Sequence, residues 1–343
     1  MKKLCVWIVS VCLLLAMCSC AASQETAYAP VTPVGEVPAE FADIVAENRF
    51  GDVRQVGDKL VRVDSHLTWV DMAGNVIASY EIPQGGYYSV KSDALLSTSD
   101  GGMLLALGFQ DRYLSETDTW ASEAGVSSLV IKLDAYANVE WQTELDDVEG
   151  AMLWNCIETN DGYCFFGQQQ TPETKRLGVY SRTDLSVLVL DRQGRLVSTQ
   201  IYGGSDYDDF YRAEMTETGY AVYTSSQSDD GLFEGSLPEG KTSASWRVLL
   251  DEAFSVTGLE QVEYDVLRTK EEPLTLDYGD FTLVVTENIT GVYENQPLAM
   301  NFPWYYYETV YSAWQDGKLL WRAAVDSSPD YDAWVGAIHQ NAE

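Results

Sequence analysis

Apolar residues in this chain occur in short runs bounded by turn residues, and some runs are apolar at every position. Met103–Leu107 and Val187–Leu190 have no polar residue at alternate places, so such strands must be buried on both faces. Long segments with the 3.6-residue spacing of an amphipathic helix are absent. The pattern predicts an all-β domain in which sheets cover one another.

A strand that ends in an acidic or polar residue, then a turn, then a second strand recurs five times. The anchor residues that end the first of these strands are Asp71, Asp134, Asp191, Asp251 and Gln315. The differences between these positions are 63, 57, 60 and 64 residues. A period this regular is typical of a repeat architecture.

A second signature precedes each later anchor. Turn sequences at Thr98–Gly102, Thr159–Gly162, Glu217–Gly219 and Tyr278–Asp280 each lead into a strand, and Asn, Asp and Gly supply the positive φ angles of tight hairpins. Each unit therefore has four antiparallel strands, and stacked propeller blades bury such sheets on both faces. We predict a β-propeller-like array of about five four-stranded blades between Phe50 and Val325.

A partial sixth blade remains open. Ser327–Asp332 is similar to Gly203–Asp208, so Ala333–Gln340 forms either a sixth first strand or a short terminal helix.

Two segments resemble the repeats of bacterial β-propeller repeat lipoproteins. Leu133–Gln142 is similar to their LDxxGNxxWQ element, and Ile201–Asp209 is similar to their YGGSxxDD element. The resemblance covers about residues 50 to 335 and is best in the second and third units, although Trp141 has no counterpart at Ser198. It implies a propeller architecture and no fixed activity.

The N-terminus has the layout of an export signal. Lys2 and Lys3 precede the apolar stretch Leu4–Met17, which is too short for a membrane-spanning helix. Ser19-Cys20 after this stretch resembles a lipobox, so we predict a signal at residues 1–19 and lipidation of Cys20. An ordinary signal peptide cut near Ala22 is the alternative.

The rest of the chain divides into a tether and one domain. Residues 20–47 are predicted to be a proline-containing tether that ends in a short helix at Glu40–Glu47, and residues 48–343 a single β-propeller domain. We expect an exported protein, lipid-anchored to the cell membrane and facing outside the cytoplasm.

The charge excludes some partners. The chain has 53 acidic and 21 basic residues, a formal net charge of −32, which repels nucleic acid and anionic bilayers. We expect a glycan, peptide or envelope protein as partner, and membrane contact only through the lipid. No cofactor motif is recognisable, and the Gly-x-x-Trp docking element of quinone enzymes is absent.

Candidate catalytic and metal residues are few. The two histidines, His66 and His339, lie in a turn and at the chain end, where neither suits a catalytic triad or a zinc site. Clustered acids are interpreted as solvated turn residues rather than calcium ligands; they are Asp206, Asp208 and Asp209, Asp146, Asp147 and Glu149, and Asp229 and Asp230. We therefore expect no catalytic residue, no metal and no enzymatic activity.

Cys156 and Cys164 flank the Asn160-Asp161-Gly162 turn. With a three-residue loop, Thr159–Asp161, they would face each other across two strands. An exported chain permits their oxidation, so either a disulfide or two packed thiols follow.

Two surfaces are candidates for recognition. Trp304, Tyr305, Tyr306 and Tyr307 would either stack on sugars or pack between blades, with Trp304 and Tyr306 on one face of the strand and Tyr305 and Tyr307 on the other. The polar segments Gln110–Gly125, Gln168–Thr183 and Ser225–Ser243 join the second and third strands and differ between units, as recognition loops on a repeat scaffold do.

The leading functional hypothesis is a surface-anchored, non-catalytic binding or scaffold module. The alternative is a glycoside hydrolase in which Glu158, Glu214 and Glu263 supply acid and base in a central tunnel.

Overall fold

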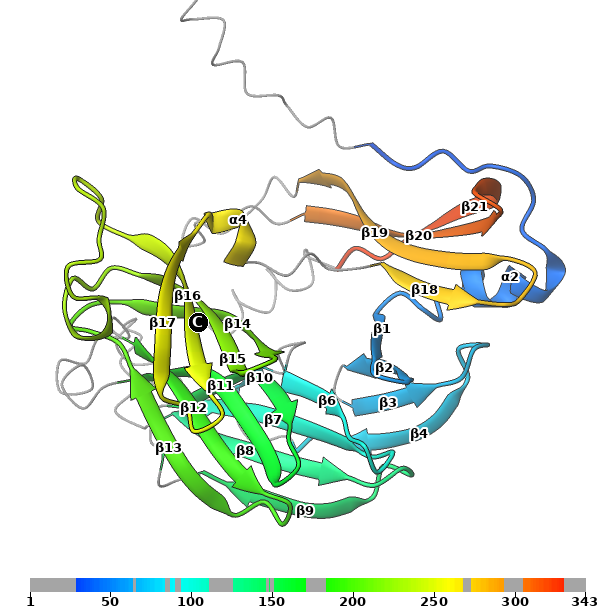
Figure 1. Cartoon of the computed structure of the whole chain (residues 1–343). Coiled ribbons are helices and arrows are strands. Elements are labelled where there is room, and N and C mark those ends of the chain that lie inside the picture. The colour runs from blue at the N-terminus through cyan, green and yellow to red at the C-terminus, as the bar shows by residue number, and fades with distance from the viewer. Residues whose placement is uncertain are drawn as a thin grey trace, which may run out of the picture. The chain divides into compact units, whose positions relative to one another are not determined.

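A computed structural model (Figure 1) describes residues 29–63, 66–83, 87–89, 94–110, 126–145, 148, 151–170, 183–267, 273–292 and 305–329. The chain forms two compact units. Unit 1 comprises the residues up to Gly51 together with those from Thr275 onward, and unit 2 comprises Asp52–Leu274.

Unit 2 contains four antiparallel sheets, which are the first four blades. The first blade is β1(Val53–Val56), β2(Lys59–Val63), β3(His66–Val70) and β4(Val76–Glu81), paired in that order. In the second, the first strand is divided into β5(Tyr87–Ser89) and β6(Leu95–Ser97), both paired with β7(Met103–Gln110), and β8(Val126–Leu133) and β9(Val139–Glu144) follow.

The next two blades repeat the same order. The third blade is β10(Ala151–Glu158), β11(Gly162–Gln170), β12(Thr183–Asp191) and β13(Leu196–Tyr202). The fourth is β14(Asp208–Thr216), β15(Gly219–Ser226), β16(Ala244–Asp251) and β17(Val256–Val262), with the 3₁₀ turn η2(Gly231–Phe233) and the short helix α4(Tyr264–Leu267) attached.

Unit 1 contains the fifth sheet and one helix. Its strands are β18(Leu274–Asp277), β19(Thr282–Val292), β20(Tyr305–Gln315) and β21(Lys318–Asp326), and the helix is α2(Ala39–Ala46). Five antiparallel sheets with consecutive strands adjacent confirm the predicted all-β class and five blades of the β-propeller type.

The anchor residues have a structural role that explains their period. In unit 2 the Oδ1 atom of each anchor aspartate accepts the backbone N–H groups two and four residues later, as Asp134 does from Tyr136 and Asn138 at 2.8 and 2.9 Å. The same pair of bonds occurs at Asp71, Asp191 and Asp251. These turns need a residue at positive φ, which is Gly74, Ala137, Gly194 or Phe254.

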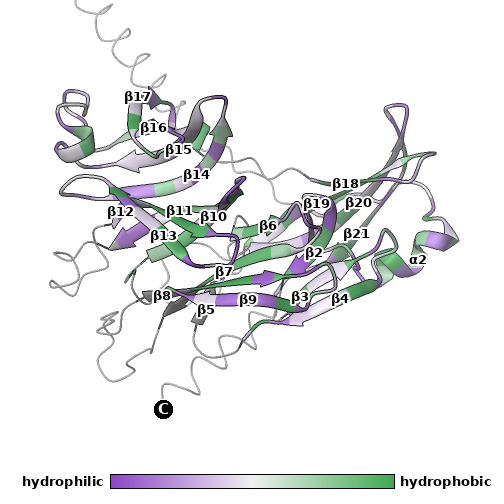
Figure 2. Ribbon diagram, turned by 60° about the horizontal axis from the view of Figure 1, so that its bottom comes forward, coloured by the Kyte–Doolittle hydropathy of each residue, from purple (hydrophilic) through white to green (hydrophobic). Residues whose placement is uncertain are grey.

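The sheets of unit 2 are buried on both faces because neighbouring blades stack. On one face of the third blade, Phe165 and Leu188 pack into a core shared with Leu104 of the second blade. On the other face, Phe166 and Val187 pack into a core shared with Val222 of the fourth blade. The hydrophobic colour along β7 and β11 in Figure 2 follows these cores. Burial of each such side chain contributes about 2 kcal/mol, so stacking dominates the stability of unit 2.

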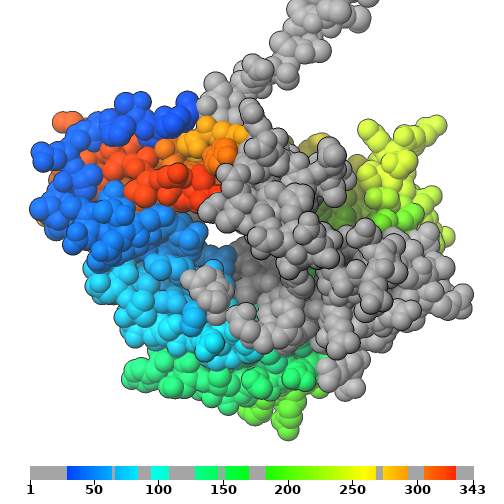
Figure 3. Space-filling view, turned by 180° about the vertical axis from the view of Figure 1, so that it is seen from behind, coloured from blue at the N-terminus to red at the C-terminus, as the bar shows by residue number. Residues whose placement is uncertain are grey.

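The N-terminal segment packs against the fifth sheet. Val34 forms an antiparallel bridge with Arg322 on β21, and Phe41 of α2 lies against the rings of Tyr278, Phe281 and Trp321, with centroids 5.0 to 5.9 Å away. Figure 3 shows this blue segment lying over the orange and red strands. From residue 29 onward, the segment predicted as a tether is therefore docked on the sheet, and its helix is α2, as expected near Glu40–Glu47.

Candidate functional site

The two described cysteines form no disulfide, which was one of the two alternatives left open by the sequence. Cys156 pairs with Phe165, and Ile157 pairs with Cys164, because the turn has only two central residues, Asn160 and Asp161, rather than three. A shift of one residue moves a side chain to the opposite face of the sheet. Cys156 consequently packs toward the second blade and Cys164 toward the fourth, and both are free, buried thiols. The disulfide interpretation was wrong, and two packed thiols are observed.

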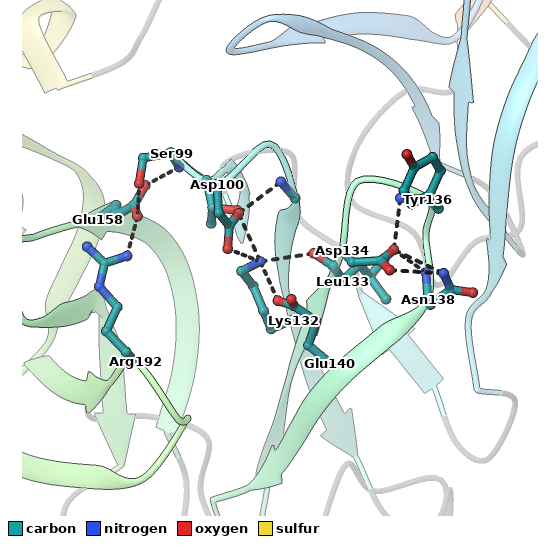
Figure 4. A network of polar contacts seen from close by, with 12 residues as sticks. Ser99, Asp100, Lys132, Leu133, Asp134, Tyr136, Asn138, Glu140, Glu158 and Arg192 are labelled. Atoms are coloured by element: carbon teal, nitrogen blue, oxygen red, sulfur yellow. Dashed lines mark hydrogen bonds and ion pairs between the residues drawn. The ribbon is translucent and has the colours of Figure 1, made fainter.

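A buried lysine organises the turn edge of the second blade (Figure 4). The Lys132 side chain is 1% exposed, and its Nζ lies 2.8 Å from carboxylate oxygens of both Asp100 and Glu140. It also donates to the carbonyl of Leu133 at 3.0 Å. Burial alone would lower the pKa of Lys132, but the hydrogen bonds to the two acids outweigh it and raise the pKa. Lys132 is therefore a permanent cation and not a nucleophile.

The same network joins the second and third blades. The Glu158 carboxylate accepts the backbone N–H and the hydroxyl of Ser99 at 2.7 and 2.8 Å and is paired with Arg192. Burial would raise the pKa of Glu158, but Arg192 and Ser99 outweigh it and lower the pKa. Glu158 thus holds the Ser99 turn against the third blade.

The other two candidate glutamates are also unsuited to acid catalysis. Glu214 accepts the Tyr223 hydroxyl at 2.7 Å and is paired with Arg212 at 2.6 Å, and these contacts lower its pKa. Glu263 is exposed at the end of the fourth blade. A glycosidase needs one carboxyl whose pKa is raised. The geometry of Glu158 and Glu214 therefore does not support the glycoside hydrolase interpretation.

At the opposite edge of the third and fourth blades lie two carboxyls, Asp184 and Asp208, whose pKa values are raised rather than lowered. Asp208, the first residue of β14, is fully buried. Its Oδ2 accepts the Gly204 N–H at 2.8 Å and the Ser228 hydroxyl at 3.3 Å, whereas its buried Oδ1 has no hydrogen-bond partner. Asp208 is therefore not the solvated turn acid that its sequence context predicts, and that interpretation was wrong.

Asp184 of β12 lies beside Asp208. Both side chains crowd the same glycine, since a Cβ on Gly203 would lie 2.3 Å from an oxygen of Asp184 and 2.5 Å from one of Asp208. Burial, with added repulsion from Asp208 and Asp230, raises the pKa of Asp184 to about 7. Burial also raises the pKa of Asp208 to about 6, and hydrogen bonds from neighbouring donors only partly offset this. Carboxyls whose pKa values are raised in this way are candidates for a functional site.

The buried side chains around Asp184 and Asp208 are polar. Buried hydroxyl and amide side chains gather at this edge; they are Gln168, Thr183, Ser186, Thr224, Ser226, Ser228 and Ser245. Gln168 donates to Thr183 at 3.0 Å and to Asp209 at 3.2 Å. The burial of these side chains could not be predicted from the sequence, because hydroxyl residues at strand ends are also common in exposed positions.

Two segments cover the acid pair: the link 203–207, which joins β13 to β14, and the loop 227–243, which joins β15 to β16. Backbone N–H groups of the link donate to the loop, Ser205 to Asp230 at 2.6 Å and Asp206 to Ser228 at 3.0 Å. Backbone N–H groups of the loop donate back, Leu232 to Gly203 at 2.9 Å and Gln227 to Tyr207 at 2.8 Å. These hydrogen bonds hold the loop against the link, and Ser228 of the loop contacts Asp208.

The remaining candidate residues are not brought together. Tyr305 and Tyr307 share one face of β20 with centroids 6.4 Å apart, as predicted, and Tyr306 is 37% exposed. Cys20, Trp304 and His339 lie outside the described residues, as do Asp146, Asp147, Glu149 and most of the first two recognition loops. His66 is half-buried in β3. Over the described ranges, no group of three or more Asp, Glu, His and Cys side chains is arranged to hold a metal ion.

Within the described part of the chain, no helix is long and apolar enough to cross a membrane.

Comparison with known proteins gives a fold likeness only. No protein-family model matches the sequence, and no curated protein matches it. A mutant of the apocarotenoid oxygenase of Synechocystis is 10% identical over 80% of this chain and 71% of its own, with a TM-score of 0.35, and the cobalt-substituted enzyme gives the same values. A lignostilbene dioxygenase of Pseudomonas brassicacearum is 13% identical over 77% of this chain and 60% of its own, with a TM-score of 0.31.

These neighbours are enzymes, which contradicts the expectation that the chain has no enzymatic activity. We withdraw that expectation. At these identities and TM-scores the likeness assigns no reaction to this chain. The class that the fold itself defines is the β-propeller.

Proposed function

We propose that this chain is an exported lipoprotein, attached to the membrane through Cys20, whose propeller blades present their loop edge to a glycan, peptide or protein of the envelope. The support for recognition at this edge is the contrast between the two ends of the blades. At one end the anchor turns repeat the same hydrogen bonds in all four blades of unit 2. At the other end the connections between second and third strands differ in sequence and length from blade to blade.

The loop 227–243 is the observation that carries the proposal. It projects exposed polar side chains, among them Glu234, Glu239 and Lys241, while its base is fixed on the link by the hydrogen bonds to Ser205 and Asp206. A loop that is variable in sequence but fixed at its base suits recognition, because little conformational entropy is lost when a partner binds.

Attachment is tested by metabolic labelling with a radioactive fatty acid. We expect label on the native chain and none on Cys20→Ser, because the thiol of the predicted lipobox cysteine carries the lipid. Cys18→Ser is the matched control and should remain labelled. Equal labelling of both variants, or of neither, would show that Cys20 is not the attachment site.

Recognition is tested by measuring binding of the purified domain to glycan arrays and to peptides and polymers of the envelope. The variant Glu234→Ala/Glu239→Ala/Lys241→Ala should weaken binding about tenfold or more, as loss of a few interface contacts does. The control Tyr136→Ser changes a side chain that is 80% exposed at the opposite edge and should bind as the native domain does. Loss of binding in the control alone would place recognition at the anchor-turn edge instead.

A further inference from the structure

We infer that Asp184 and Asp208 retain one shared proton at neutral pH, and that loss of this proton releases the loop 227–243 from the link 203–207. The inference rests on the proposed function in one respect: the segment released is the proposed recognition loop. It concerns the regulation of that loop and is tested without a ligand.

The geometry around Gly203 is the first support. An oxygen of the half-buried Asp184 and one of the buried Asp208 lie 2.3 and 2.5 Å from the point where a Gly203 Cβ would stand, so these two oxygens are less than about 5 Å apart. Two carboxylates in such proximity cannot both be ionised without strong repulsion, and pairs of this kind retain one proton.

The hydrogen bonding of Asp208 is the second support. Oδ2 has donors in Gly204 and Ser228, whereas the buried Oδ1 forms no hydrogen bond, although the nearby Ser226 hydroxyl lowers the pKa of Asp208 somewhat. A bare buried oxygen on an ionised carboxylate is costly. A proton retained by either carboxyl removes one of the two charges of the pair. The raised pKa values of Asp208 and Asp184, about 6 and about 7, agree with this reading.

The charges that face the pair all have the same sign. Asp206 of the link and Asp230 of the loop add repulsion to Asp208 and Asp184 respectively, and Asp209 of β14 is engaged by the neutral Gln168 of β11. None of the ion pairs formed between described residues involves these acids. An ionised Asp184 is therefore repelled both by Asp208, beside the link, and by Asp230 of the loop.

The loop is placed to respond to this charge. Asp230 accepts the Ser205 N–H at 2.6 Å, and Ser228, which donates to Asp208, accepts the Asp206 N–H at 3.0 Å. When the pair loses its proton, the hydrogen bonds between the loop and the link break. Asp230 of the loop and Asp206 of the link can then move away from the ionised pair. Opening returns the carboxyls to water, where their pKa values are ordinary.

Amide hydrogen exchange of Ser205, Gln227 and Leu232 measures opening directly. After correction for the intrinsic rate, we expect the opening constant of the native chain to rise at least about tenfold per pH unit from about pH 4 and to level off above about pH 7, because the pKa values of the pair are ordinary in the open state and raised in the closed state. Asp184→Asn keeps the shape and removes one of the two titrating carboxyls, so its opening constant should rise less in total and level off at a lower pH, near the pKa of about 6 of Asp208. Asp229→Asn, at an exposed loop position, is the matched control and should behave as the native chain.

Two results would overturn the inference. One is an opening constant of the native chain that does not change with pH. If Asp184→Asn does not fold, Asp184→Ser serves as the second neutral variant. The other is restoration of protection at pH 8 by millimolar CaCl₂, which would make the acids a cation site. Failure of the ligand-binding assays would leave these exchange results unaffected, so the two proposals fail separately.

Discussion

Removing the Lys132 charge should cost far less stability than removing the carboxylates that surround it. In Lys132→Met the apolar stem is retained in its buried position, and Asp100 and Glu140, whose side chains are 52% and 45% exposed, regain water. The carbonyl of Leu133 loses one donor, which costs about 1 kcal/mol. Since replacement of a buried ion by a hydrophobe of similar size is often neutral, we expect a net change of at most about 1–2 kcal/mol.

The converse variant leaves the buried ammonium without counter-charges. Asp100→Asn/Glu140→Gln keeps the shapes of both side chains, but Lys132 is 1% exposed and cannot rehydrate, so we expect a loss of about 3–5 kcal/mol. Urea denaturation followed by far-UV circular dichroism measures both, with Lys241→Met as the exposed control. A loss of 3 kcal/mol or more in Lys132→Met, with a change below about 1 kcal/mol in the double variant, would refute the reasoning.

Three further predictions concern other parts of the fold. Phe41→Ala should destabilise unit 1 by about 3–4 kcal/mol, because the ring is 5% exposed among three aromatic rings; thermal denaturation detects this, and an unchanged midpoint would contradict the docking of α2. Reducing agent should leave the denaturation midpoint unchanged, because Cys156 and Cys164 are free; a lower midpoint would reveal a bridge. The free energy of unfolding should fall by about 3 kcal/mol between pH 5 and 8: the pKa values of Asp184 and Asp208 are raised in the fold, so their contribution is full below about pH 4 and is lost as the pH rises through 6 to 7. Urea titrations of the native chain and Asp184→Asn test this sign, and a rise would refute it.

The repeat and the blades could be predicted from the sequence because local chemistry fixes them. Each anchor aspartate of unit 2 closes its own turn with two backbone bonds, so its position marks the end of a third strand regardless of the neighbouring blades. The unbroken apolar runs of β7 and β12 likewise required cover on both faces, and the stacked cores supply it.

The candidate site was harder to predict because it depends on register and on contacts distant in sequence. One residue fewer in the Asn160-Asp161 turn moved Cys164 to the opposite face from Cys156. Asp208 looks like its neighbours Asp206 and Asp209 in the sequence, and only the packing of β12 and the loop 227–243 makes it buried and short of a donor. The acid pair joins positions 184 and 208, which no local pattern connects.

The docking of the N-terminal segment also determines when folding is complete. The backbone of Val31 donates to Glu308 across 277 positions of chain, and that of Phe50 donates to Tyr311 across 261. Contacts so far apart in sequence form late, because a long loop must close before they are gained. During synthesis, Phe41 and the rest of the apolar face of α2 are therefore made before the strands that bury them. Truncation of the N-terminal segment should therefore destabilise the last strands of unit 1, and truncation of those strands should uncover α2.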